Sequence, residues 1–349
     1  MAHRDAYFDN LKFLLIALVV VGHAIEPLSS DPALRPLYLT IYAFHIPLFV
    51  LISGYFCKNI TSTDYRIKVV GSLVVPYLIF ETLYSLYDYA FSGGQRLTFS
   101  YFTPYWLMWF IFSSIIWKAV LPYAVKIRGA LPISIVVAVL AGYATDAEYY
   151  ASISRTIVFF PFFLAGYYLD KKTIIRLRTP LLKGLSIFVL AAAGVIMVKY
   201  GSFIRAEWFY GSLPYRALGH PEWTAGLYRI AAYAASVLIG GAVMILMTGR
   251  TVPHVSKLGR NTLYAYLLHG FVVRSLPTSW LYDHYGAGWW MAALIPLGLL
   301  LTAFLSSEPV MSRFRWLLEP NLDRWFKKAD PAEQGSGGRR ERRPQPRND

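Results

Sequence analysis

The sequence predicts an all-α membrane protein in which about ten helices form one bundle. Hydrophobic residues make up 56% of the 349 residues, charged residues make up only 15%, and the mean hydropathy is +0.42. This composition is typical of polytopic membrane proteins and argues against an ordinary soluble domain. We therefore expect a membrane-embedded domain over residues 1–320. A basic, disordered cytoplasmic tail is expected over residues 321–349, which are too poor in apolar side chains to form a core.

Each long apolar run predicts one spanning helix, because about 20 apolar residues cross the hydrocarbon core of a bilayer. The fifth and sixth runs are short, so these helices could be tilted, or one of them could be re-entrant. The predicted spans are residues 11–28, 37–56, 69–91, 105–123, 131–145, 152–169, 181–200, 226–248, 258–282 and 289–307.

The distribution of the net charge of +14 predicts the orientation of the bundle. Short cytoplasmic loops collect lysine and arginine. With ten spans, most of the 34 basic residues fall on the side that holds both termini. We therefore predict a multi-pass plasma-membrane protein with both termini in the cytoplasm. Basic residues at these places orient the chain and contact anionic membrane lipids, so we expect no nucleic-acid partner.

The first span carries a titratable side chain at a depth where hydrocarbon is expected. Lys12 and His23 are eleven positions apart, so they project from one helix face about 16 Å apart along the axis. Glu26 follows one turn later. An ionisable group in hydrocarbon costs about 2.5 kcal/mol or more unless it faces a partner or a wet cavity. His23 is therefore a functional candidate, and the structural alternative is a histidine that only packs against a neighbouring hydroxyl.

Three further titratable groups are expected at the depth of His23. A rise of about 1.5 Å per residue places His45, Glu81 and His269 in roughly the same layer. Histidine can accept and return a proton near neutral pH, and a carboxylate beside it fixes its tautomer. The groups predict either a shared site that activates a hydroxyl or a structural network in which they satisfy one another. No metal site is predicted, because His23, Glu26 and His45 lack the tight spacing of zinc ligands.

A second site is predicted near the cytoplasmic surface, where Lys12 and Lys118 enter apolar spans. Long basic side chains at such positions can reach an anionic ligand, for example a nucleotide phosphate. On the opposite side, the aromatic loop between Lys199 and Gly226 suits either stacking on a sugar ring or a membrane interface.

Several short stretches, taken together, resemble one known family. They follow the family's order over nearly the whole membrane domain. The matching stretches are Tyr7 to Lys12 with Gly22-His23, Phe44 to Phe49 with Ile52 to Phe56, Pro76 to Phe80, Tyr105 to Leu107 with Trp117, Pro161 to Tyr167, and Gly259 to Tyr264 with Leu268-His269. On these residues the chain resembles the integral-membrane acyltransferase family 3, and within it the fucose 4-O-acetylase and related acetyltransferases.

The resemblance implies transfer of an acyl group, commonly acetyl, from acyl-CoA to a hydroxyl of a sugar, glycan, glycolipid or glycosylated metabolite. No permanently bound cofactor is implied. His23 corresponds to the family's essential histidine, and Lys12 to the basic residue that precedes it by ten intervening positions. The family also tends to carry two arginines before the third span, spaced to share a helix face. The nearest residues here, Arg66 and Lys68, are two positions apart and point in different directions on a helix.

From the resemblance and the depth argument together, we predict a division of the site. Acyl-CoA is expected to bind at Lys12, Arg66, Lys68 and Lys118, and His23 to act as the catalytic base. The supporting residues are predicted to be Glu26, His45, Glu81 and His269.

Two other functions are consistent with buried histidines. A transporter or flippase for a glycan or lipid-linked intermediate would use them to relay protons, although the internal repeats common in transporters are not visible. A non-catalytic scaffold would use them only for stability. The sequence leaves open the identity of the acceptor, the acyl chain length and the oligomeric state. It also leaves open whether the acyl group is transferred directly or through an acyl-enzyme.

Overall fold

The computed structural model describes residues 5–58, 69–91, 97, 99–144, 152–276 and 288–320, and for residues 288–292 it describes the backbone alone. The described residues contain helices and no strand, so the all-α prediction is confirmed. The long helices are α1 (Ala6–Ile25), α2 (Arg35–Tyr55), α4 (Val75–Phe91), α5 (Trp109–Ala124), α6 (Ala130–Ala141), α7 (Ile153–Tyr168), α9 (Pro180–Tyr200), α11 (Ala225–Leu246), α13 (Thr262–Ser275), α15 (Gly288–Leu305) and α16 (Glu308–Leu318). Short turns of helix are η1 (Glu26–Leu28), η2 (Val70–Val74), η3 (Trp106–Met108), α8 (Lys171–Arg176), α10 (Glu207–Tyr210) and α12 (Pro253–Leu258).

A helix lies in each of the ten ranges predicted to span the membrane, but not all of these helices are long enough to do so. Among the described residues, six helical segments are long and apolar enough to cross a membrane. A seventh is added if residues 293–305 and 308–318, which are bent by 64° at their junction, form one span. The predicted count of ten is therefore not confirmed. The shortfall includes α6 and α7, which have 12 and 16 residues and lie in the fifth and sixth predicted spans.

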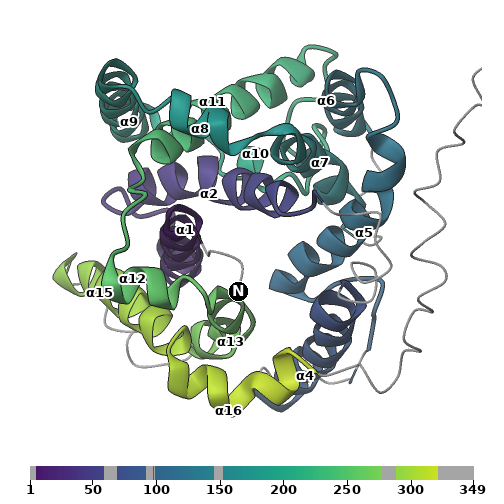
Figure 1. The fold of residues 1–349 in the computed structure, drawn as a ribbon. Coiled ribbons are helices and arrows are strands. Elements are labelled where there is room, and N and C mark those ends of the chain that lie inside the picture. Colours follow the sequence, from purple (N-terminus) through teal and green to yellow (C-terminus); the bar gives the residue numbers. More distant parts are fainter. Residues whose placement is uncertain are drawn as a thin grey trace, which may run out of the picture.

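Helix α1 lies at the centre of the bundle, between α2 on one side and α13 and α15 on the other (Figure 1). It is apolar on nearly every face, and a helix of that kind is stable only when it is surrounded. Leu11, Leu15, Ile16, Val20 and Ile25 are accordingly inaccessible to solvent. Any polar side chain on this helix therefore faces other helices rather than lipid.

Helices α2 and α7 cross at unusually close range. A Cβ atom at Gly54 would overlap the carbonyl of Phe163, and one at Gly166 would overlap the carbonyl of Leu51. Glycine is required at both positions because the two backbones touch. This crossing fixes α7 against α2 and so brings the first turn of α7 to the same end of the bundle as the last turn of α1.

The peripheral helices expose apolar side chains outward, as expected for surfaces that contact lipid. Leu181, Phe188 and Val198 of α9 and Leu227 and Val237 of α11 are largely exposed. The predicted tail, residues 321–349, lies outside the described residues, as do Arg66 and Lys68.

Candidate active site

His23 lies in the last turn of α1, where the chain changes from α-helix to the 3₁₀ turn η1. This turn brings Glu26 back over the imidazole, so that Nδ1 of His23 lies 3.0 Å from Oε2 of Glu26. When Nδ1–H donates to the carboxylate, Nε2 is left as the proton acceptor. The side chain of His23 is 18% exposed and that of Glu26 is 39% exposed, so the pair is accessible but largely enclosed. The predicted pairing of the two residues is thus present.

Helix α2 contributes a hydroxyl and a second histidine to the same place. The hydroxyl of Tyr42 lies 3.3 Å from Nδ1 of His23. His45, which is buried, donates from Nδ1 to the carbonyl of Ile41 at 2.6 Å and presents its ring edge to Tyr42. Two residues further on, Pro47 cannot donate to the carbonyl of Ala43.

The carbonyl that Pro47 leaves unbonded is satisfied from another helix. The hydroxyl of Ser236 in α11 donates to the carbonyl of Ala43 at 2.6 Å. The proline therefore does not leave a buried acceptor unpaired in the turn that carries His45.

His269 of α13 lies on the other side of His23. The two imidazoles stack with ring centroids 5.6 Å apart and an angle of 19° between their planes. Nδ1 of His269 donates to the carbonyl of Ala265 at 2.9 Å. Its Nε2 has no hydrogen-bond partner within the described parts of the chain.

The last predicted supporting residue, Glu81, is connected to His23 through the turn at Tyr105 and Trp106. Both carboxylate oxygens of Glu81 accept the backbone N–H of Tyr105, at 2.8 and 3.0 Å. The next residue, Trp106, adopts a left-handed backbone (φ 20°) and places its ring 4.6 Å from that of His23. Glu81 therefore holds the turn that packs on His23 rather than the histidine itself.

A cavity of about 130 Å³ opens beside His23. Its lining combines three of the predicted site residues, His23, Glu26 and His45, with nine residues that the sequence analysis did not single out as site residues. The complete lining is His23, Glu26, Tyr42, His45, Ile46, Trp106, Leu107, Trp109, Arg155, Phe159, Phe209 and Tyr210. His269 lies behind His23 and does not line the cavity.

Tyr210, from the 201–224 segment, lines the cavity and is held by a second tyrosine. The hydroxyl of Tyr210 lies 2.5 Å from that of Tyr38. Burial raises the pKa of Tyr210 above its usual value, so this hydroxyl stays neutral. The aromatic segment after Lys199 therefore contributes to the cavity through Tyr210 and the neighbouring Phe209.

The structure describes two of the four basic residues that were predicted to bind acyl-CoA. Nζ of Lys12 lies 2.9 Å from Oδ1 of the buried Asp9, whose Oδ2 lies 3.9 Å from Nε of Arg260. Lys118 lies in α5, half buried, and interacts electrostatically with Cys57. The structure thus places Lys12 at the opposite end of α1 from His23, in an ion-pair cluster. Arg66 and Lys68 are outside the described residues and stay untested.

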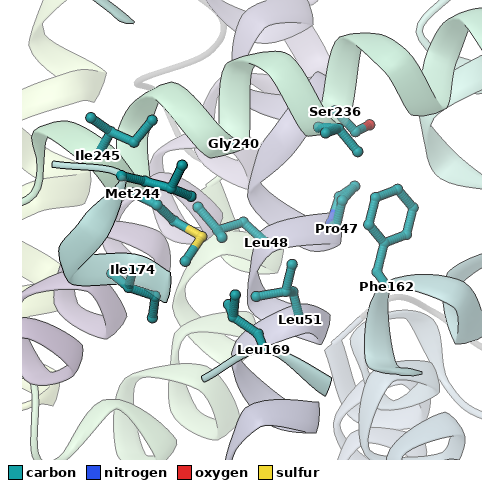
Figure 2. A pocket seen from close by; sticks show the side chains of 13 residues that line it. Pro47, Leu48, Leu51, Phe162, Leu169, Ile174, Ser236, Gly240, Met244 and Ile245 are labelled. Atoms are coloured by element: carbon teal, nitrogen blue, oxygen red, sulfur yellow. The ribbon is translucent and has the colours of Figure 1, made fainter. Parts of the chain in front are cut away.

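Other cavities lack the chemistry of the His23 cavity. One of about 170 Å³ lies between α2, α7, α8 and α11, and Figure 2 shows Leu48, Phe162 and Met244 among its lining side chains. No ionisable side chain lines it. A second apolar cavity, of about 360 Å³, lies between α5, α6 and α7. Among the described residues, no cluster of three or more His, Cys, Asp or Glu side chains has the arrangement of a metal site.

Comparisons with known proteins identify the family of the chain. A family model described as an acyltransferase domain, acyltransferase family 3, matches residues 5–307. Nodulation protein NolL of Sinorhizobium fredii is 26% identical over 307 residues, which are 78% of this chain and 79% of that protein. Nodulation protein NolL of Mesorhizobium japonicum is 32% identical over 130 residues, 33% of this chain and 35% of that protein. No solved structure matches the chain. The family match covers all the helices that form the His23 cavity, and the chain belongs to the acyltransferase family 3.

Proposed function

We propose that the protein is a membrane-bound O-acyltransferase that moves an acyl group, most simply acetyl, from acyl-CoA to a hydroxyl of a sugar, glycan or glycosylated metabolite. The observation that carries the proposal is the His23–Glu26 pair at a cavity, with the carboxylate 3.0 Å from Nδ1 and the opposite nitrogen free to take a proton. Membership of an acyltransferase family supports the reaction class.

In the proposed reaction, His23 acts as general base. Its Nε2 takes the proton from the acceptor hydroxyl as the oxygen forms a bond to the acyl carbonyl carbon. The carbon–sulfur bond of the thioester then breaks, and the departing thiolate of coenzyme A takes the proton back from the imidazolium. Glu26 stabilises the imidazolium between these steps, because a carboxylate beside a histidine favours its charged form.

The two ends of α1 suit the two substrates. Acyl-CoA carries phosphates, which the cations at the Lys12 end attract. Lys12 and His23 are separated by about 16 Å along the helix, so the acyl arm of the donor would run beside α1 toward the histidine. We propose that the Lys12 end faces the cytoplasm, where acyl-CoA is made, and that the acceptor enters from the outer side of the plasma membrane.

The test is acetyl transfer in membranes that receive radiolabelled acetyl-CoA, with the label followed into glycan and glycolipid. The parent is compared with His23→Ala and with His254→Ala, an exposed histidine of α12, at equal expression. We expect transfer with the parent and with His254→Ala, and a loss of about 10²- to 10⁴-fold with His23→Ala. Equal transfer by the parent and His23→Ala would refute the catalytic assignment.

A further inference from the structure

Arg155 is a cation in the wall of the His23 cavity that makes no ion pair within the described residues. It lies in the first turn of α7 and lines the same cavity as His23 and Glu26, whose carboxylate acts on it only through space. Its guanidinium lies over the ring of Trp109, 4.9 Å from the centroid. Nε is buried and has no hydrogen-bond partner, and no carboxylate pairs with the side chain, as far as the described residues extend.

Other arginines that pack into the bundle make at least one hydrogen bond or ion pair. Arg35 donates to the carbonyls of Gly201 and Ile204 at 2.7 and 2.8 Å, and Arg274 pairs with a carboxylate at 2.8 Å. Arg229 donates to one carbonyl at 2.7 Å, although its Nε and second terminal nitrogen have no partner among the described residues. Burying a cation without such partners is costly, and a ring contact offsets only part of that cost. Of these four arginines, Arg155 lines the polar cavity beside His23, where a ligand could reach it.

The start of α7 adds to the positive potential around Arg155. The first N–H groups of a helix have no acceptor within the helix and carry a partial positive charge. In the described part of the chain no side chain caps these groups of α7, since Ser152 has a left-handed backbone (φ 48°) and makes no capping hydrogen bond. A cation in this turn is unfavourable by itself and becomes favourable when an anion binds beside it.

The cavity consequently combines groups of unlike character. Glu26 and the acceptor nitrogen of His23 accept hydrogen bonds from hydroxyl groups, and the carboxylate of Glu26 repels anions. Arg155 attracts anions. A ligand that matches both carries a hydroxyl and a negatively charged group.

We propose that Arg155 forms an anion subsite and that the acceptor is an acidic sugar, which carries a phosphate or carboxylate besides the hydroxyl that receives the acyl group. This inference rests on the proposed acyl transfer for the identity of the reacting group. The guanidinium would bind the oxyanion through two parallel N–H donors, a geometry that an ammonium group cannot reproduce.

The test measures sugar binding in the absence of any acyl donor. The full-length protein in lipid nanodiscs is dialysed to equilibrium against radiolabelled glucose, glucose 1-phosphate or glucuronate. We expect the parent to bind at least one anionic sugar about tenfold more tightly than glucose, the lower end of the effect of a charge-assisted hydrogen bond. Binding of only the phosphate or only the carboxylate identifies the group that the acceptor carries.

Variants separate the subsite from the fold and from the chemistry. Arg155→Gln is expected to abolish the preference, Arg155→Lys to keep part of it, and the control Arg216→Gln, at an exposed arginine outside the cavity, to keep all of it. Melting temperatures show whether Arg155→Gln is folded, and if it is not, Arg155→Lys decides the question. His23→Ala should keep the binding preference while it loses acyl transfer.

Two results would overturn the subsite: equal binding of the three sugars by the parent, or a preference that survives in folded Arg155→Gln. A parent that shows the preference but transfers no acetyl group retains the subsite, and only the proposed acyl transfer then fails.

Discussion

Replacing Glu26 by Gln isolates the electrostatic part of the proposed mechanism. Glutamine has nearly the same shape and keeps an oxygen near Nδ1 of His23, but it removes the negative charge that lies 3.0 Å away. A hydrogen bond to a charged group contributes about 1.5–3 kcal/mol. Because the side chain of Glu26 is 39% exposed, solvent screening reduces the expected loss to about 1–1.5 kcal/mol. That corresponds to a fall in kcat of about 5- to 10-fold.

The assay is the initial rate of coenzyme A release at saturating donor and acceptor, with protein purified in nanodiscs. His23→Ala should lose far more than Glu26→Gln, about 10²- to 10⁴-fold, because it removes the base itself. The double variant should be no slower than His23→Ala, since Glu26 acts only through the histidine. Glu308→Gln is the matched control, because Glu308 also accepts from a cation at 3.0 Å but lies at the start of α16.

The reasoning is refuted if Glu26→Gln has the kcat of the parent, which would mean that the carboxylate does not stabilise a charged imidazole. It is equally refuted if Glu26→Gln loses as much as His23→Ala and the double variant loses still more, since Glu26 would then act independently of the histidine.

Two further predictions concern the parts that hold the site. Glu81→Ala leaves the N–H of Tyr105 without its acceptor, which costs about 1–3 kcal/mol and loosens Trp106 on His23. The kcat should fall with an unchanged KM for acetyl-CoA, while Glu81→Gln, which keeps an acceptor, should retain most activity. A loss of stability in both variants without a change in kcat would contradict this role. Gly166→Ala forces a methyl group into the carbonyl of Leu51 and should lower the free energy of unfolding by about 1–3 kcal/mol, read as a lower melting temperature in detergent. The control Gly194→Ala, which meets no atom within 4 Å, should leave that temperature equal or slightly higher, and an equal response of both variants would show that the α2–α7 contact is not tight.

The elements that follow from local chemistry could be predicted from the sequence. Apolar runs of sufficient length form helices whether or not their neighbours are known, because an isolated apolar segment in a membrane must satisfy its own backbone. A helix accordingly occurs in each of the ten ranges, although within the described ranges only six or seven segments are long enough to span. His23 and Glu26 could be paired in advance because they are one turn apart on the same chain segment.

The depth argument worked for part of the site, since height along a helix is known from the sequence and direction around it is not. His269 stacks on His23, and His45 lines the same cavity as His23. The side chain of Glu81 instead accepts from the backbone of Tyr105. Whether two groups at one height meet depends on the rotation and crossing angle of their helices, and those are set by packing.

The sequence by itself determined an all-helical chain, the first helix with its histidine and carboxylate, and the family to which the chain belongs. Only the tertiary structure decided which helix faces the histidine across the cavity. In the sequence, Arg155 is one arginine near the start of an apolar run; in the structure, the contact of α2 and α7 at Gly54 and Gly166 places it in the wall beside Trp109. That placement depends on two backbones that touch more than 100 residues apart in the chain, and no local pattern of residues encodes such a contact.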